Sequence, residues 1–151
     1  MAEIARIADQ LQRAFRGPAW HGPAVMELLA DVAADQAAAH PVPHAHSIWE
    51  IVLHLGAWER AGTRRIGGEA VALSRVQDWP PIPRFSEEGW RLAVRELEQA
   101  HEALHAAIQQ MPEARLAEPC PGKKYDFYFL LHGLVQHDLY HAGQIALLKN
   151  G

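Results

Sequence analysis

Residues 90–111, WRLAVRELEQAHEALHAAIQQM, decide the fold class of this chain. Apolar or ring-bearing side chains recur there at alternating steps of four and three residues: Trp90, Val94, Leu97, His101, Leu104, Ile108 and Met111. This spacing puts them on one face of an α-helix and is typical of a helix packed nearly parallel or antiparallel to its neighbours. The stretch predicts a long bundle helix that begins at Ser86.

Three other stretches have helical periodicity, over residues 3–15, 23–38 and 126–149. Within the second, residues 31–38 either continue the helix or form a separate short one. A further helix is marked by Ser47 and Glu50, which form a capping box, and it should stop near Gly67 and Gly68. Nothing reads as a strand. We therefore expect an all-α, up-and-down four-helix bundle, with one domain over residues 1–151.

The longest predicted connection runs from Gly67 to Phe85 and contains Trp79 followed by Pro80, Pro81 and Pro83. Loops of this length in small domains usually cover something or carry function. One interpretation makes the Trp79 loop a lid or a dimer contact. The other has Trp79 plug the end of the bundle.

Composition excludes several classes of function. The 151 residues are 49% hydrophobic with a net charge of -4, as in globular proteins. Lys and Arg are scattered and the calculated pI is about 6.2, so we expect no nucleic-acid partner. No apolar run reaches the length of a membrane span, and the N-terminus does not resemble a signal peptide. With Cys120 as the one cysteine, a cytoplasmic location is expected.

Three histidines suggest a metal site. His137 and His141 are four residues apart, so their rings leave the same helix face one above the other. His54 shares a helical stripe with Trp58 and other apolar residues. Together they predict a three-histidine site for a divalent ion, with a position left open for water or substrate. The alternative is three hydrogen-bonded core histidines without a metal.

Other histidines and acidic residues fit a shared metal site less well than these three. His101 and His105 repeat the four-residue spacing, and we expect His101 to be buried and His105 exposed; alternatively, His101 lies near the metal. His46 is placed to reach the mouth of the cavity, whereas His132 has the wrong angle to join His137. Glu59, Asp138 and Tyr140 are near the histidines in sequence. Asp138 and Tyr140 are expected to point away from the face of His137 and His141, either as partners of the ligands or as structural residues. No catalytic base is evident, and the motifs of di-iron bundles and zinc proteases are missing.

Two segments, HSIWEIVLHLGAWE at 46–59 and HDLYHAGQIALLK at 137–149, resemble the DinB/YfiT-like superfamily of metal-binding four-helix bundles. The resemblance implies that His54, His137 and His141 bind a divalent metal, often zinc or nickel, and that the protein is a homodimer. It also implies that Gly143 makes a close helix contact and that Gln144 is a polar residue near the site.

The resemblance further implies a metal-dependent hydrolase or a thiol-dependent S-transferase that uses bacillithiol, mycothiol or glutathione. The competing hypothesis is a noncatalytic stress-response or small-molecule-binding bundle held together by its metal. An open coordination position facing a cavity lined by Trp49 or Trp58, Trp20 and the Trp79 loop would favour the enzyme. A fourth protein ligand, such as His101, would favour the structural role.

Overall fold

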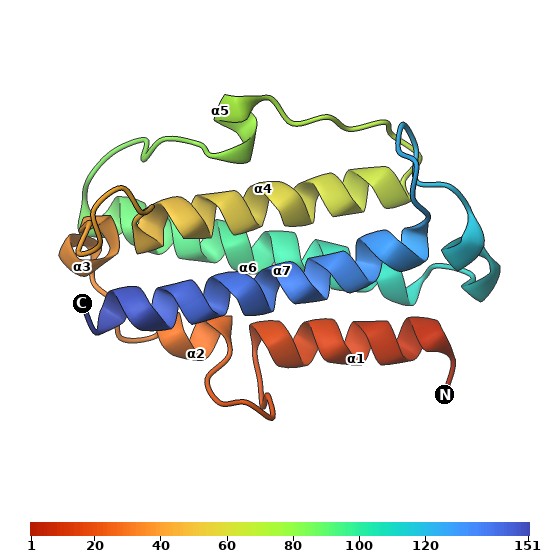
Figure 1. The fold of residues 1–151 in the computed structure, drawn as a ribbon, viewed down its shortest axis with the longest axis horizontal. Helices are drawn as coiled ribbons and strands as arrows, with labels where there is room; N and C mark the ends of the chain where they lie inside the picture. Colours follow the sequence, from red (N-terminus) through yellow and green to blue (C-terminus); the bar gives the residue numbers. More distant parts are fainter.

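Four long helices build the protein (Figure 1). The computed structural model describes residues 1–151. The long helices are α1 (Glu3–Phe15), α4 (Ile48–Ile66), α6 (Glu87–Gln109) and α7 (Phe127–Lys149). The short ones are α2 (Val25–Leu29), α3 (Ala34–Ala38), α5 (Arg75–Asp78) and the 3-10 helix η1 (Glu113–Ala117). The predicted all-α bundle is confirmed, and none of its helices combines the length and apolarity that a membrane crossing requires.

Helix direction departs from simple up-and-down alternation, because α4 and α6 run the same way. The Trp49 ring near the start of α4 lies 5.5 Å from that of Trp90 near the start of α6. Further along, Glu59 of α4 faces His101 of α6 at 3.7 Å. The chain returns along the bundle over residues 67–86 before α6 begins (Figure 1). This connection of about 20 residues can easily span a helix about 28 Å long, so the parallel arrangement is sterically available.

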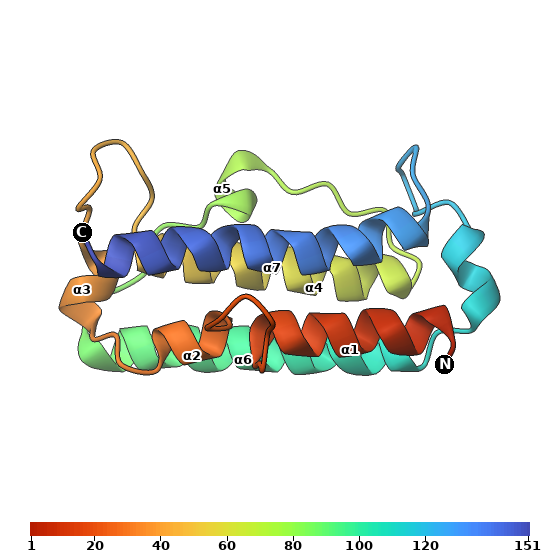
Figure 2. The same cartoon turned by 60° about the horizontal axis from the view of Figure 1, so that its bottom comes forward.

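The short helices lie in the connections. The tract predicted over residues 23–38 is interrupted between α2 and α3. The alternative of a separate short helix is therefore confirmed. Helix α5 interrupts the predicted long loop, where Ser74 caps it reciprocally with Gln77: the Ser74 Oγ accepts from the Gln77 N–H at 3.3 Å. Figure 2 shows α5 on the outer side of the layer formed by α4 and α7, away from α1 and α6. The return segment therefore covers one flank of the bundle.

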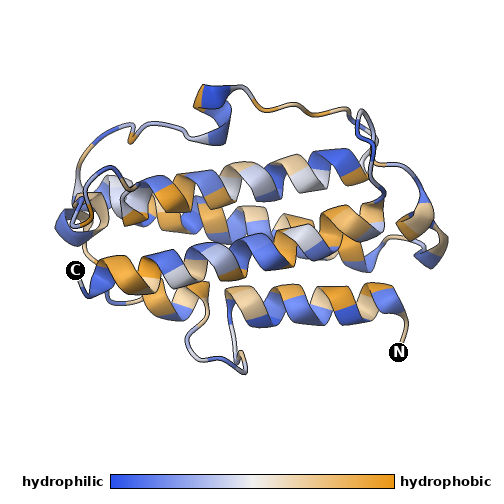
Figure 3. Cartoon of the chain, viewed as in Figure 1, coloured by the Kyte–Doolittle hydropathy of each residue, from blue (hydrophilic) through white to orange (hydrophobic).

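A polar layer divides the core into two apolar clusters. One cluster of 18 buried residues includes Trp49 and Leu97, and the other, of 16, includes Leu104 and Leu134. In Figure 3 the middle of α7 is blue between two orange ends, which marks the position of this layer. Ser47 begins α4 as predicted: its Oγ accepts from the Glu50 N–H at 3.2 Å, while Glu50 accepts from the Ser47 N–H at 2.7 Å. This start fixes the register of the helix that carries His54.

Candidate metal centre

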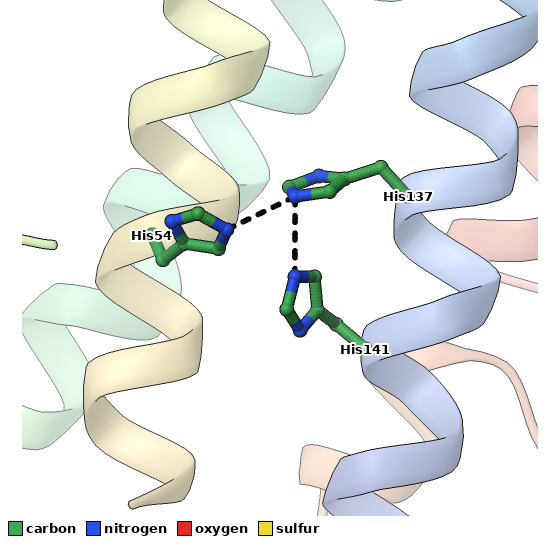
Figure 4. A group of neighbouring side chains, drawn as sticks. All are labelled: His54, His137 and His141. Carbon is green, nitrogen blue, oxygen red and sulfur yellow. Dashed lines mark hydrogen bonds between the residues drawn. The ribbon is translucent and has the colours of Figure 1, made fainter. Parts of the chain in front are cut away.

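The three predicted histidines meet between α4 and α7 (Figure 4). The Nε2 atom of His137 lies 3.0 Å from that of His54 and 3.1 Å from that of His141. His54 and His141 are buried, at 5% and 4% exposed, and His137 is half-buried. These three residues could hold a metal ion. The structure thus brings together every residue of the predicted set, while their role as ligands stays a prediction.

Outer hydrogen bonds fix the orientation of two of the rings. His54 donates through Nδ1 to the backbone carbonyl of Asp78 at 2.7 Å, and His141 donates through Nδ1 to the Gln144 Oε1 at 2.6 Å. Each neutral ring then presents the lone pair of Nε2 to the centre. A single N–H on His137 could satisfy only one of these two lone pairs. A cation would satisfy all three nitrogens at once, so the residues fit a divalent metal.

The protonation of the histidines also suits metal binding. Burial, together with the neighbouring His141 and His54, lowers the pKa of His137 to about 3. Burial likewise lowers the pKa of His141 to about 4, and it lowers the pKa of His54. All three imidazoles are therefore neutral near pH 7, which is the form that binds metals.

The return segment covers the site from outside. The Trp79 ring stacks on His54 at 3.7 Å and on His46 at 3.6 Å, so that it lies between the two imidazoles. Trp58 donates through Nε1 to the Asp78 Oδ1 at 2.6 Å, which ties α5 to α4. Trp79 thus lies over the histidines at mid-bundle and does not plug the end of the bundle.

Two cavities flank the histidines. One, of about 340 Å³, reaches His141 and is bordered by His46, Trp79, Tyr140 and Leu147, among others. The second, of about 310 Å³, reaches His54 and His137 and is bordered by Trp58, Arg65, Tyr125 and Phe129, among others. Both are lined largely by apolar and aromatic side chains. A molecule could therefore approach the histidines from either side.

Comparison with known families agrees with this architecture. The sequence model of the DinB superfamily matches residues 19–145. The chain belongs to the DinB superfamily. The matched region of this DinB chain contains His54, His137, His141 and the return segment. Searches of curated proteins and of solved structures found no match.

Some of the expected neighbours occupy other places in this DinB-superfamily chain. Trp58 and Trp79 border the cavities, whereas Trp49 is fully buried in the core and Trp20 is fully exposed. His46 reaches a cavity as expected, and His132 instead contacts Glu3 at 3.1 Å.

Asp138 lies in a group apart from the three histidines, and it is 1% exposed because α7 is covered on two sides by α4 and α1. Two other expectations need correction. His105 is half-buried instead of exposed. Gly143 has no neighbour within 4 Å of where a Cβ would lie, so it makes no close helix contact.

His101 lies with Glu59 and Asp138 in a separate group and not among the three histidines. Asp78 was not anticipated as a partner of His54. The one sequence signal for its position is the capping box of Ser74 and Gln77, which predicts a helix turn just before it. Gln144 was expected near the site and is hydrogen-bonded to His141.

Proposed function

We propose that the protein is a metal-dependent enzyme, in which His54, His137 and His141 bind zinc or nickel, and that it transfers a low-molecular-weight thiol to an electrophile. The thiol would be of the bacillithiol, mycothiol or glutathione type. The observation that carries the proposal is the convergence of three histidines beside two cavities, with the Nε2 of His137 3.0 Å from that of His54 and 3.1 Å from that of His141. The family membership supports the metal.

The charge of the site favours an anionic partner. Three neutral imidazoles leave the charge of a divalent ion uncompensated. When bound, such an ion lowers the pKa of a coordinated thiol or water and so supplies a nucleophile at neutral pH. The nearest carboxylate, that of Asp78, lies 3.1 Å from the outer Nδ1 atom of His54 and bonds Trp58. The Asp78 carboxylate is therefore placed to orient the His54 ring and not to bind the metal. This supports a coordination position at the centre that is open to a substrate.

Two cavities support a reaction with two substrates. Thiol transfer needs a thiol and an electrophile at the same centre, whereas hydrolysis needs one substrate and water. Tyr125, Phe129 and Trp58 offer aromatic surface to an apolar electrophile on one side. His46 and Gln144 offer polar groups on the other side, where a hydrophilic thiol would lie. Trp79 borders the cavity of His46 and Gln144 and stacks on His54.

Metal content and thiol adduct formation test the proposal together. Protein purified without a histidine tag is compared with the His137→Ala/His141→Ala variant, and His132→Ala on the same helix serves as control. We expect the wild type and His132→Ala to contain stoichiometric metal and to consume an electrophile such as 1-chloro-2,4-dinitrobenzene only when thiol is present. The double variant should show neither property. An absence of metal in the wild type, also after zinc or nickel is added, would overturn the proposal.

The same assay separates the alternatives. Ester or amide cleavage that needs the metal but no thiol would replace the transferase by a hydrolase. Stoichiometric metal without either activity, together with a large loss of stability in the double variant, would favour a noncatalytic bundle that the metal holds together.

We also propose that the protein is a homodimer. Large apolar side chains are exposed along the outer face of α7, with Tyr140 67% and Leu147 73% exposed. Exposed apolar surface of this kind is typical of a face that another protein covers. A second copy of the chain is the partner that the family resemblance implies.

A further inference from the structure

A second group of ionisable side chains lies in the interior of the bundle. Glu59 of α4, His101 of α6 and Asp138 of α7 are each 1% exposed. One nitrogen or oxygen atom from each lies within 4.8 Å of those of the other two. The group forms the polar layer between the two apolar clusters, and it shares no residue with the three-histidine site.

The atoms that face one another in this layer have no hydrogen-bond partner. They are both carboxylate oxygens of Glu59, the Oδ2 of Asp138 and the Nδ1 of His101. His101 donates through Nε2 to the Gln12 Oε1 at 3.0 Å, so its Nδ1 is a lone-pair acceptor. With both carboxyls ionised, acceptors meet acceptors, and burying such groups without a partner costs several kcal/mol in general. A cation or a proton must therefore lie between them.

We propose that Glu59, His101 and Asp138 bind a second divalent cation inside the bundle. Two carboxylates and one neutral imidazole balance its charge completely, unlike the three histidines. Two oxygen donors with one nitrogen donor suit Mn²⁺ or Fe²⁺ better than a soft ion. Three donors about 2.1 Å from one ion lie about 3.0 to 3.6 Å from one another. The Nδ1 of His101 and the Oε1 of Glu59 are 3.7 Å apart, so this pair needs to contract by only a few tenths of an ångström.

A cavity between α1 and α6 comes close to this layer. Gln12 and His105 both border this cavity, which has a volume of about 410 Å³. Gln12 is the residue that contacts His101, and the rings of His105 and His101 are 6.0 Å apart. One layer of side chains thus separates the cavity from the buried group. The His101 and His105 repeat in α6 runs from the buried group to the cavity.

Protons are the competing occupant of the same space. Burial raises the pKa of Glu59 to about 8 and raises that of Asp138 well above its usual range, so a shared proton could also join the two carboxyls. A metal and protons differ in one decisive respect. If a metal is the occupant, a chain that lacks the three-histidine site still binds one equivalent of added metal. If protons are the occupant, the same chain binds no metal.

The test uses the full chain with His137→Ala/His141→Ala as background, stripped of metal with a chelator. Mn²⁺ is added at about pH 8, where protons compete less than at neutral pH, and free Mn²⁺ is followed by electron paramagnetic resonance. We expect one bound equivalent and a rise in melting temperature of about 5 °C or more at a hundredfold excess over Kd. Adding Glu59→Gln and Asp138→Asn, which keep the side-chain size, should abolish both effects. Glu98→Gln on α6, which lies nearer the surface, is the matched control and should abolish neither.

Absence of Mn²⁺, Fe²⁺ and Zn²⁺ binding by the background chain would overturn the proposal and leave protons in the layer. So would equal binding with and without the Glu59 and Asp138 substitutions. The background chain keeps the layer intact, so its titration decides the question even where the further variant does not fold. Because the background lacks the three-histidine site, its result is independent of the proposed enzyme function.

Discussion

The histidine rings of the candidate centre owe their orientation to residues that would not touch the metal. Gln144 accepts the Nδ1 hydrogen of His141, and Asp78 accepts that of His54. Such outer partners typically contribute 10- to 100-fold to metal affinity. We therefore predict that Gln144→Ala weakens zinc binding about 10- to 100-fold in a competition titration with a chromophoric chelator. Gln136→Ala, exposed on the same helix, should leave the affinity unchanged; equal losses in both variants would contradict this role.

His101 gives the metal-free protein a pH-dependent stability. Burial lowers its pKa from 6.5 to about 4, so the folded state binds fewer protons than the unfolded state between these values. The free energy of unfolding must then fall as the pH drops through this window, by up to roughly 3 kcal/mol. Urea denaturation with a chelator present should show a weaker pH dependence for His101→Gln than for the wild type. His132→Gln, at a half-exposed position, should behave as the wild type; parallel curves for all three would contradict the prediction.

The three histidines were predictable because His137 and His141 are spaced to share one face of a helix and His54 lies on the apolar stripe of another. It could not find Asp78, which lies 24 residues beyond His54 and reaches it only because the return segment folds back over α4. The burial of Asp138 was not predictable for a different reason. The spacing of His137 and His141 identifies one face of α7, whereas the structure buries more than one side of this helix.

Helix α4 packs closely against its neighbours at Gly62. A Cβ there would lie 2.8 Å from the Leu134 Cδ1 and 3.2 Å from the Leu104 Cδ1, whereas one at Gly143 would meet nothing. Overpacking costs about 1 to 3 kcal/mol, and replacing a helical glycine by alanine gains about 1 kcal/mol. We predict that Gly62→Ala is less stable than Gly143→Ala by about 1 to 3 kcal/mol in urea denaturation. Equal stability of the two variants would show that the leucines move aside freely.

The return segment should control access to the histidines. Trp79 stacks on His54, so its removal opens the site to solvent. We predict that Trp79→Ala speeds the transfer of bound zinc to a chelator by about tenfold, through loss of a stacking contact of about 1 kcal/mol and of the cover itself. Trp20→Ala, the same change at a fully exposed position, should not alter the rate. An unchanged rate in Trp79→Ala would mean that the cover does not limit exchange.

The long helices were predictable because each has enough turns to show a repeat. Helices α5 and η1, of four and five residues, are too short for periodicity to reveal. The parallel course of α4 and α6 was beyond the sequence pattern as well, since a connection as long as 67–86 permits either direction.

Helix α7 is the helix most suited to join two copies of the chain. Its buried face supplies His137 and His141, while Leu147 is 73% exposed on its outer face. We predict that Leu147→Glu converts a dimer to a monomer in light scattering, because a charge would have to be buried in the interface. Leu92→Glu on α6, at a side chain 47% exposed, should remain dimeric. Dimers in both variants would place the interface elsewhere.

The return segment, residues 67–86, can be damaged without loss of the helical bundle. The four long helices are held by their apolar clusters, whereas the orientation of His54 depends on α5, a single turn within the return segment. A proteolytic nick within residues 67–86 could release α5 while the helices stay associated. Circular dichroism would then report an intact bundle in a sample in which His54 is no longer held in position by α5. Helical content alone is therefore a poor measure of competent protein.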